Sequence, residues 1–203
     1  HLYLEYEKTN NQIAELTGQR SILDLNKEIL NNNLFGVDIN EESIEITKLS
    51  LWLKTAERGK PLESLKANFI AGNSLGLTEA VPGSSFYWKD AFKDIFDQGG
   101  FDVVLGNPPY VRQELFSDIK PWLEKNYSVY HGVLDLYGYF FELGCKLLTP
   151  KGRMAYISNA TFFKTSSSEK LRNYLAHEVV LEKIIDFGDV QVFEGVTTYP
   201  AII

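Results

Sequence analysis

The chain has 203 residues, a formal net charge of −7 and a single cysteine, Cys145. A chain of this length can bury a sizeable core, and its 44% hydrophobic and 23% charged residues exclude a disordered, collagen-like or disulfide-scaffold protein. One cysteine and three scattered histidines exclude a cysteine-rich zinc site, so we expect no bound metal. From the length we expect one compact unit, and the single cysteine, which cannot form an intrachain disulfide, favours the cytoplasm. No apolar stretch is long enough to span a membrane.

The acidic balance is unusual for a protein that binds nucleic acid, since phosphate contacts need clustered lysine and arginine. The acidic excess falls in residues 1–140, and residues 141–203 carry equal numbers of acidic and basic side chains. Charge alone favours a small-molecule ligand. If the substrate is a polyanion, we expect its main basic groove outside this chain or in a local patch that the summed charge hides.

Short β-rich runs alternate with helical patterns, which predicts an α/β fold with an open, mostly parallel sheet. Residues 1–30 are expected to be a helical lead-in. The apolar runs are nearly continuous, which is typical of strands covered on both faces. The expected strands, in chain order, are residues 34–39, 68–73, 101–106, 154–158 and 181–186, with a further strand starting at Pro200.

Helices are predicted between these strands. Asn40 is the expected N-cap of the first, because acidic residues fill the turn that follows it. Residues 134–148 have apolar side chains at helical spacing, and the Thr-Pro-Lys-Gly run at 149–152 is expected to stop that helix. A further helix is expected at 169–177. Residues 78–99 are expected to form a flexible insertion.

Three polar side chains follow predicted strands at their carboxyl ends, where ligands bind in open α/β sheets. They are Asp38, Asn73 and Asn107, separated by about one β-α unit each. Asp38 can accept both hydroxyls of a ribose or, alternatively, cap the following helix. Asn73 can hydrogen-bond an adenine edge, although Asn-Ser after a glycine is also an ordinary loop.

The tetrapeptide Asn107-Pro108-Pro109-Tyr110 directly follows an apolar strand. Its prolines remove two backbone donors and stiffen the turn, so the Asn107 side chain and the Pro108 carbonyl are held as outward-facing acceptors. Two such acceptors suit a planar NH2 group, whose nitrogen becomes a better nucleophile when both hydrogens are bonded. Tyr110 offers a stacking face for that group. The alternative is a rigid surface turn with a half-buried tyrosine.

Residues 101–112, which contain this turn, resemble the catalytic strand and loop of S-adenosylmethionine-dependent DNA adenine-N6 methyltransferases. The match is closest to the gamma type of type IIG and related restriction-modification or phage-resistance systems. Other segments resemble further parts of that family: residues 33–53 its ribose-binding strand and helix, 71–74 its adenine-binding loop, 135–140 the helix that flanks the cofactor, and 193–198 the loop that packs on the flipped base.

The resemblance implies a Rossmann-like class I methyltransferase sheet that transfers methyl directly to the N6 amino group of a flipped adenine in double-stranded DNA. Asn107 and Pro108, in the turn completed by Pro109, would hold the amino group. Tyr110 would stack on the adenine, and Phe193 would face its other side.

The cofactor implied by the resemblance is S-adenosylmethionine. Asp38 would bind its ribose, and the rest of the cofactor site would consist of Ile39, Asn73, Ser74, Asn107 and Phe140. The reaction needs no cysteine nucleophile, and Cys145 is expected to be a core residue in a helix.

The family's glycine-rich loop, on a strand preceding residue 1, and its target recognition domain have no counterpart in this sequence. We therefore expect residues 1–203 to be a partial methyltransferase catalytic domain that works with a target recognition domain, with or without a nuclease. We also expect it to bind cofactor weakly on its own.

Two alternatives stay open. The first is a protein glutamine-N5 methyltransferase, because the Asn-Pro-Pro-Tyr turn also resembles the motif of that family. That interpretation explains neither the aromatic-rich stretch between Tyr110 and Asp135 nor the segment 186–198. A non-catalytic module with a methyltransferase fold, binding DNA or partner subunits, would have no need of the turn.

Overall fold

The structure is a computed structural model. Where the chain length predicted one compact unit, its contacts divide it into two: unit 1 comprises residues 1–74 and 84–86, and unit 2 comprises residues 75–83 and 87–203. No helix in the described part of the chain is long and apolar enough to cross a membrane. The described residues are 2–18, 25–56, 64–76, 86–190 and 199–203.

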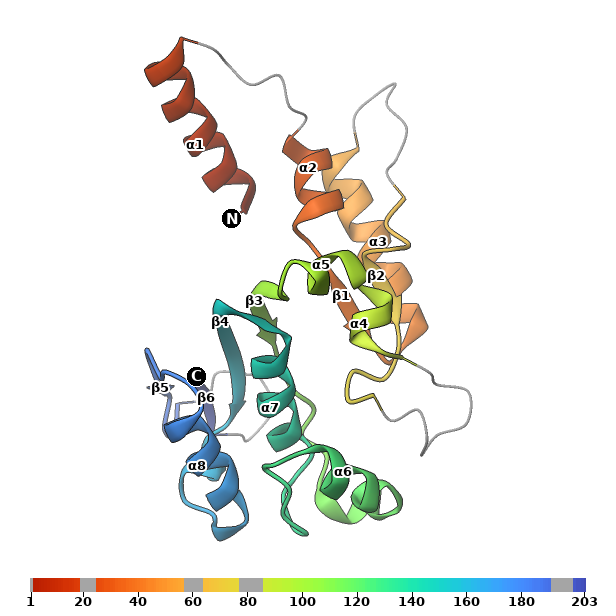
Figure 1. Ribbon diagram of the computed structural model, residues 1–203, viewed down its shortest axis with the longest axis vertical. Coiled ribbons are helices and arrows are strands. Elements are labelled where there is room, and N and C mark those ends of the chain that lie inside the picture. The colour runs from red at the N-terminus through yellow and green to blue at the C-terminus, as the bar shows by residue number, and fades with distance from the viewer. Residues whose placement is uncertain (1, 19–24, 57–63, 77–85, 191–198) are drawn as a thin grey trace. The chain divides into compact units, whose positions relative to one another are not determined.

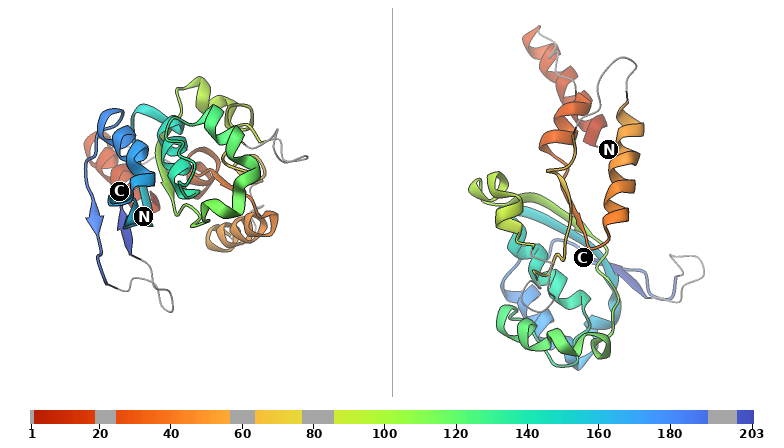
Figure 2. Two further views of the ribbon diagram at one scale, coloured as in Figure 1. Left: turned by 90° about the horizontal axis from the view of Figure 1, so that it is seen from below. Right: turned by 90° about the vertical axis from the view of Figure 1, so that its right-hand side faces the viewer.

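Unit 1 is built on two short parallel strands, β1 (Gly36–Asp38) and β2 (Phe69–Ala71), which confirm the first two predicted strands. Asn40 caps the following helix as predicted, because its side chain accepts a hydrogen bond from the Ser43 N–H at 3.0 Å. Figures 1 and 2 show that helix running alongside β1 and β2. The helices of the unit are α1 (Leu2–Thr17), α2 (Leu25–Asn32) and α3 (Glu41–Thr55).

A buried asparagine ties α2 to the strand pair of unit 1. The side-chain amide of Asn68, only 6% exposed, donates to the carbonyl oxygens of Leu30, Asn31 and Leu34 at 3.0–3.1 Å. The backbone carbonyl of Asn68 accepts a hydrogen bond from the Gly36 N–H at 2.8 Å, where β1 begins. These bonds satisfy the carbonyls at the end of α2 and fix the start of β1, the strand that ends at Asp38.

Unit 2 contains a four-stranded sheet in the order β3-β4-β6-β5. β3 and β4 are parallel, but β6 runs antiparallel to both β4 and β5, so the prediction of parallel strands holds for only part of this sheet. β3 has the predicted bounds. β4 begins earlier than predicted, at Leu148, which pairs with Phe101. Residues 149–152 therefore follow the end of α7, as predicted, but they lie within β4. The bounds are β3 (Phe101–Gly106), β4 (Leu148–Asn159), β5 (Ile185–Asp186) and β6 (Pro200–Ile202).

The predicted helix at 169–177 is confirmed. The helix predicted at 134–148 is observed, but it starts three residues later and ends one residue earlier than predicted. Short 3₁₀ segments lie at η1 (Gln113–Ile119), η2 (Ala160–Phe163) and η3 (Ser166–Ser168). The α-helices are α4 (Trp88–Ala91), α5 (Lys93–Asp97), α6 (Lys120–Asn126), α7 (Tyr137–Leu147) and α8 (Glu169–His177).

The predicted flexible insertion at 78–99 is wrong for its second half. α4 and α5 form there because the rings of Trp88, Phe92 and Phe96 pack edge-on against Phe101, with ring centroids 5.7–6.0 Å apart. Aromatic edge-to-face packing stabilises such short helices more than their own hydrogen bonds do. The first part of that range, 78–85, lies outside the described residues.

Helix α7 approaches the sheet closely because it carries a glycine where Tyr156 of β4 lies. A Cβ atom on Gly144 would lie 2.5 Å from the Met154 sulfur and 2.7 Å from the Tyr156 hydroxyl oxygen. The same Tyr156 ring covers Gly106 at the end of β3, where a Cβ would lie 2.8 Å from a ring carbon. Tyr156 is 5% exposed, so its ring fills the space between α7 and the last residue of β3.

We predict that Gly144→Ala destabilises the protein, because the overpacking cost of about 1–3 kcal/mol exceeds the gain of about 1 kcal/mol in helix propensity. Urea denaturation measures the difference. The matched control is Gly132→Ala, where a Cβ has no neighbour within 4 Å; its effect should stay within about 0.5 kcal/mol. Equal stability of the two variants would contradict the close packing of α7 on β4.

Candidate active site

In unit 1, Asp38 is the last residue of β1 and its side chain is exposed. Its Oδ1 accepts the Asn40 N–H at 2.8 Å, so the carboxylate is oriented by the turn that leads into α3. Asn40, rather than Asp38, caps the helix itself. The helix-capping alternative for Asp38 is therefore wrong, and an oriented, exposed carboxylate remains. Ile39, the next residue, is 75% exposed.

The loop after β2 lies next to the end of β1. Asp38 pairs with Ala71 in the parallel register, and the Asp38 carbonyl accepts the Gly72 N–H at 2.8 Å. Asn73 and Ser74, which follow directly, are half-buried and have interactions of their own. The structure thus brings the carboxyl ends of β1 and β2, with the predicted residues of both, to one edge of unit 1.

In unit 2, the turn Asn107–Tyr110 directly follows β3 and belongs to no helix or strand. Asn107 and Pro109 are exposed, whereas Pro108 between them is buried. The turn is therefore anchored in the core through Pro108 while the Asn107 side chain stays accessible. Gly106 is required before it, since the Tyr156 ring occupies the space that a Cβ would need.

Tyr110 lies with one part of its ring exposed and the rest against α7. It is 41% exposed, and its ring centroid lies 6.5 Å from that of Tyr137, which is only 3% exposed. Tyr137 in turn packs against Phe162 of η2 at 6.4 Å. Burial, followed by the neighbouring Tyr137, raises the pKa of the Tyr110 phenol above its ordinary value of 10.0, so it is a neutral ring at physiological pH.

Of the other predicted residues, Phe140 lies in α7 and is half-buried against the core of unit 2. Cys145 lies in the same helix, as expected, and burial raises the pKa of its thiol to about 11. It is therefore protonated at neutral pH and unsuited to be a nucleophile. Phe193 lies outside the described residues. In the described part of the chain, no group of three His, Cys, Asp or Glu side chains could hold a metal ion.

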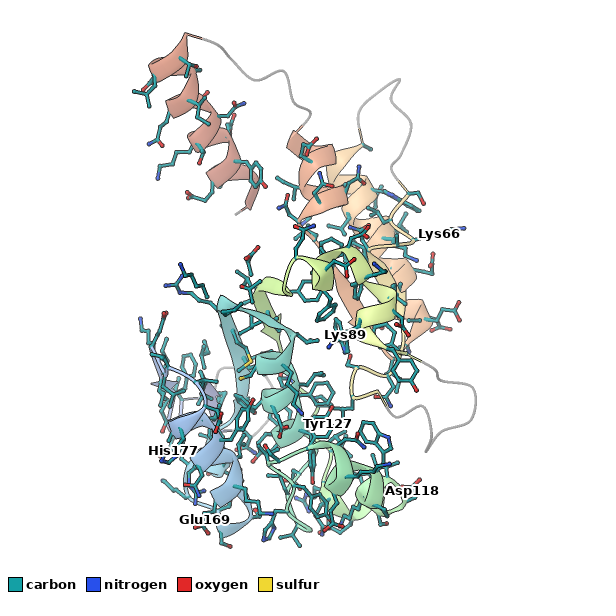
Figure 3. The ribbon with its side chains drawn as sticks, in the orientation of Figure 1. Lys66, Lys89, Asp118, Tyr127, Glu169 and His177 are labelled. Atoms are coloured by element: carbon teal, nitrogen blue, oxygen red, sulfur yellow. The ribbon has the colours of Figure 1, made fainter. Side chains whose placement is uncertain are left out.

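Sequence reasoning missed the carboxylate of Glu142, which is 1% exposed in α7. It accepts the backbone N–H groups of Ser128 and Val129 at 3.1 and 2.9 Å and pairs with Lys146 at 2.6 Å. The Lys146 ammonium also lies 5.0 Å above the ring of Tyr127, labelled in Figure 3. Glu142 thus fixes the loop between α6 and α7. The signal in the sequence was a Glu-Lys pair at i, i+4 within an otherwise apolar helix.

Sequence comparison places the chain in a known family. Residues 32–193 match the family model described as Eco57I restriction-modification methylase. The chain is 30% identical over 218 aligned positions, 99% of its length, to the type II restriction enzyme and methyltransferase RM.Eco57I of Escherichia coli. It is 39% identical over 105 positions, half of its length, to the type II methyltransferase M.BstVI of Geobacillus stearothermophilus. The chain spans 21% and 18% of these two relatives.

A solved structure shares the fold. A nuclease-deletion mutant of the type ISP restriction-modification enzyme LlaGI, in complex with a DNA substrate mimic, superimposes with a TM-score of 0.65 at 16% identity. The match covers 98% of this chain and 21% of that one.

We predict an acid-sensitive contribution of Glu142 to stability. Burial raises the pKa of its carboxyl, but the bonds from Lys146, Val129 and Ser128 outweigh burial and hold that pKa below its ordinary value of 4.5. A depressed carboxyl pKa stabilises the fold above the unfolded-state value, and this contribution is lost as pH falls through the folded-state value. Glu142→Gln should therefore lose less stability than the wild type between about pH 6 and pH 3.

Urea denaturation at a series of pH values measures this difference. Glu124→Gln, an exposed position on α6, is the matched control and should keep the wild-type pH dependence. An unchanged pH dependence in Glu142→Gln would show that the Glu142 carboxylate does not stabilise the loop.

Proposed function

Because the chain belongs to the Eco57I restriction-modification methylase family, we propose that it transfers a methyl group from S-adenosylmethionine to the N6 amino group of adenine in DNA. The family match and the type II methyltransferase relatives support methylation of DNA in a restriction-modification system. The observation that carries the adenine-N6 assignment is the anchored turn at the end of β3, with an exposed Asn107 amide beside an exposed Tyr110 ring.

The turn can activate an exocyclic amine without a covalent intermediate. The Asn107 side-chain oxygen and the Pro108 carbonyl would each accept one N–H of the adenine amino group. Both bonds oppose delocalisation of the nitrogen lone pair into the ring, so the nitrogen becomes the nucleophile. Its rigid backbone also holds the amine in one orientation, which is the main contribution a protein makes to an in-line transfer.

Tyr110 is suited to stack on a base that has left the duplex. Its ring is 41% exposed, and the buried Tyr137 ring lies next to it with a centroid separation of 6.5 Å. Stacking on an aromatic plate offsets the lost stacking of a flipped base. Phe193 would face the other side of the adenine, as the resemblance implies.

The residues of unit 1 fit the cofactor. When bound, S-adenosylmethionine supplies a methyl group on a sulfonium, a good leaving group. The oriented, exposed Asp38 carboxylate can accept both ribose hydroxyls, as acids at strand ends do in dinucleotide folds. The exposed Ile39 side chain next to it offers an apolar face for the adenine ring of the cofactor. Asn73 and Ser74 would lie at the same adenine. The family resemblance also assigns Phe140 and Asn107 to the cofactor.

The chain is proposed to be a partial catalytic domain with a Rossmann-like class I sheet. A target recognition domain, with or without a nuclease, would come from the rest of the protein, which is proposed to be of type IIG or a related system. The first relative's name includes a restriction enzyme, and this chain spans 21% of it. Contacts to double-stranded DNA outside this chain would also account for its acidic balance, and the place of action would be the cytoplasm.

Replacing the proposed amine acceptor tests the function directly. Asn107→Ala in the full-length protein should lower the rate of N6-methyladenine formation by at least about 100-fold, the usual cost of removing one preorganised hydrogen-bonding group. The matched control is Asn173→Ala, an exposed asparagine on α8, which should keep the wild-type rate. Retained activity in Asn107→Ala with an unchanged circular dichroism spectrum would refute the assignment.

Cofactor binding provides a second test. Asp38→Ala should weaken the affinity for S-adenosylmethionine by about 10–100-fold, the value of hydrogen bonds to a charged group. Isothermal titration of the full-length protein measures it. Asp38→Asn keeps an oxygen for the Asn40 N–H and so separates loss of the turn from loss of the charge. Glu42→Ala, nearby in α3, should bind normally. Unchanged binding by Asp38→Ala would contradict the ribose assignment.

A further inference from the structure

Two backbone hydrogen bonds join the segment that follows the Asn107–Tyr110 turn to the start of α7. The Leu136 N–H donates to the Val111 carbonyl at 3.0 Å. The Gln113 N–H donates to the Asp135 side-chain oxygen Oδ1 at 3.1 Å. Asp135 and Leu136 are adjacent in the chain. Together they therefore hold Val111 and Gln113 at one point before α7.

The α7 side of these bonds is rigid. Leu134 and Tyr137, on either side of the pair, are 1% and 3% exposed. The Asp135 carbonyl also accepts the Gly138 N–H at 3.1 Å, which begins the helix. Asp135 is itself only half-buried, but its backbone cannot move without displacing core residues on both sides.

The turn side needs such support. Residues 107–112 belong to no helix or strand, and Pro108 and Pro109 have no N–H to donate. β3 fixes the turn on its N-terminal side. In the described part of the chain, the bonds at Val111 and Gln113 are the first backbone bonds to a distant segment on its C-terminal side.

Gln113 is held a second time through its side chain. The Lys120 ammonium contacts the Gln113 side-chain oxygen and also donates to the Gly132 carbonyl at 2.7 Å. Lys120 therefore links η1, which begins at Gln113, to the same α6–α7 loop that carries Asp135.

We propose that Asp135 is a positioning residue for methyl transfer, which fixes the Gln113 N–H and, through it, the placement of Tyr110 and Asn107. This role rests on the proposed function. Asp135 does not touch the substrate in this account. It acts by holding the turn in the one conformation in which the amine acceptors and the aromatic plate point at the same base.

The hydrogen bond can be removed from either end. Asp135→Ala removes the acceptor. Gln113→Pro removes the donor without strain, since Gln113 is the first residue of η1 and Arg112 before it is extended (φ −70°, ψ 147°), both compatible with proline at 113. Gln113→Ala removes only the side chain, and Asp135→Asn retains an oxygen acceptor. Asp118→Ala, an exposed aspartate of η1 labelled in Figure 3, is the charge-matched control.

Methylation of DNA by the full-length protein is measured as kcat per S-adenosylmethionine-binding site, with KM for DNA. We expect Asp135→Ala and Gln113→Pro each to lower kcat on the order of 100-fold with little change in KM, the cost of misplacing a catalytic group by about 1 Å. Because both remove one bond, the double variant should be no worse than either single one. Asp135→Asn, Gln113→Ala and Asp118→Ala should stay within a few-fold of the wild type.

Amide hydrogen exchange of the peptide spanning residues 107–116 tests the hydrogen bond without methylation. Exchange should accelerate in Asp135→Ala and not in Asp135→Asn. Unchanged exchange, or a wild-type kcat in both Asp135→Ala and Gln113→Pro, would overturn the positioning role while leaving the proposed function intact. A wild-type protein that methylates no DNA would refute the proposed function, and the positioning role with it, whatever the exchange shows.

Discussion

The packing of the Tyr156 ring against two glycines is the constraint on which the candidate site of unit 2 depends. The Tyr156 side chain lies against Gly106, the last residue of β3, and Gly144 of α7, so a Cβ at either position would displace it. Tyr156 also exchanges both backbone hydrogen bonds with Ile203 at 2.9 and 3.0 Å, just beyond β6. One residue therefore sets how close the helix lies to the sheet and where β3 ends. The turn that begins at Asn107 inherits its position from that packing.

The site then combines a rigid frame with exposed reacting groups. Tyr156 fixes the turn before Asn107, Pro108 is buried within it, and the start of α7 holds the chain after Tyr110. Asn107, Pro109 and part of the Tyr110 ring face solvent, and the buried Pro108 between them would present its backbone carbonyl to the amine. A methyl transfer without a covalent intermediate relies on orientation, and this frame supplies orientation at little entropic cost during the reaction. In unit 1, the Asn40 N–H holds the Asp38 carboxylate in one orientation.

The sequence predicted those elements whose signals are local. β3 and α8 have the predicted bounds, because an apolar run ends at Gly106 and a run of serines precedes Glu169. The direction of β6 was not predictable, since a short apolar run is the same in parallel and antiparallel pairing. The turn at 107–110 was recognisable as a motif, whereas the role of Asp135 was not, because its partner lies 22 residues away and is a backbone N–H. The ring packing of α4 and α5 also depends on tertiary contacts that periodicity does not record.

The most direct test is to identify the methylated atom. The full-length protein is incubated with unmethylated genomic DNA and S-adenosylmethionine carrying an isotopically labelled methyl group, and the DNA is digested to nucleosides for mass spectrometry. The account predicts that the label appears in N6-methyldeoxyadenosine. Label in N4-methyldeoxycytidine, or in glutamine residues of protein with none in DNA, would contradict it.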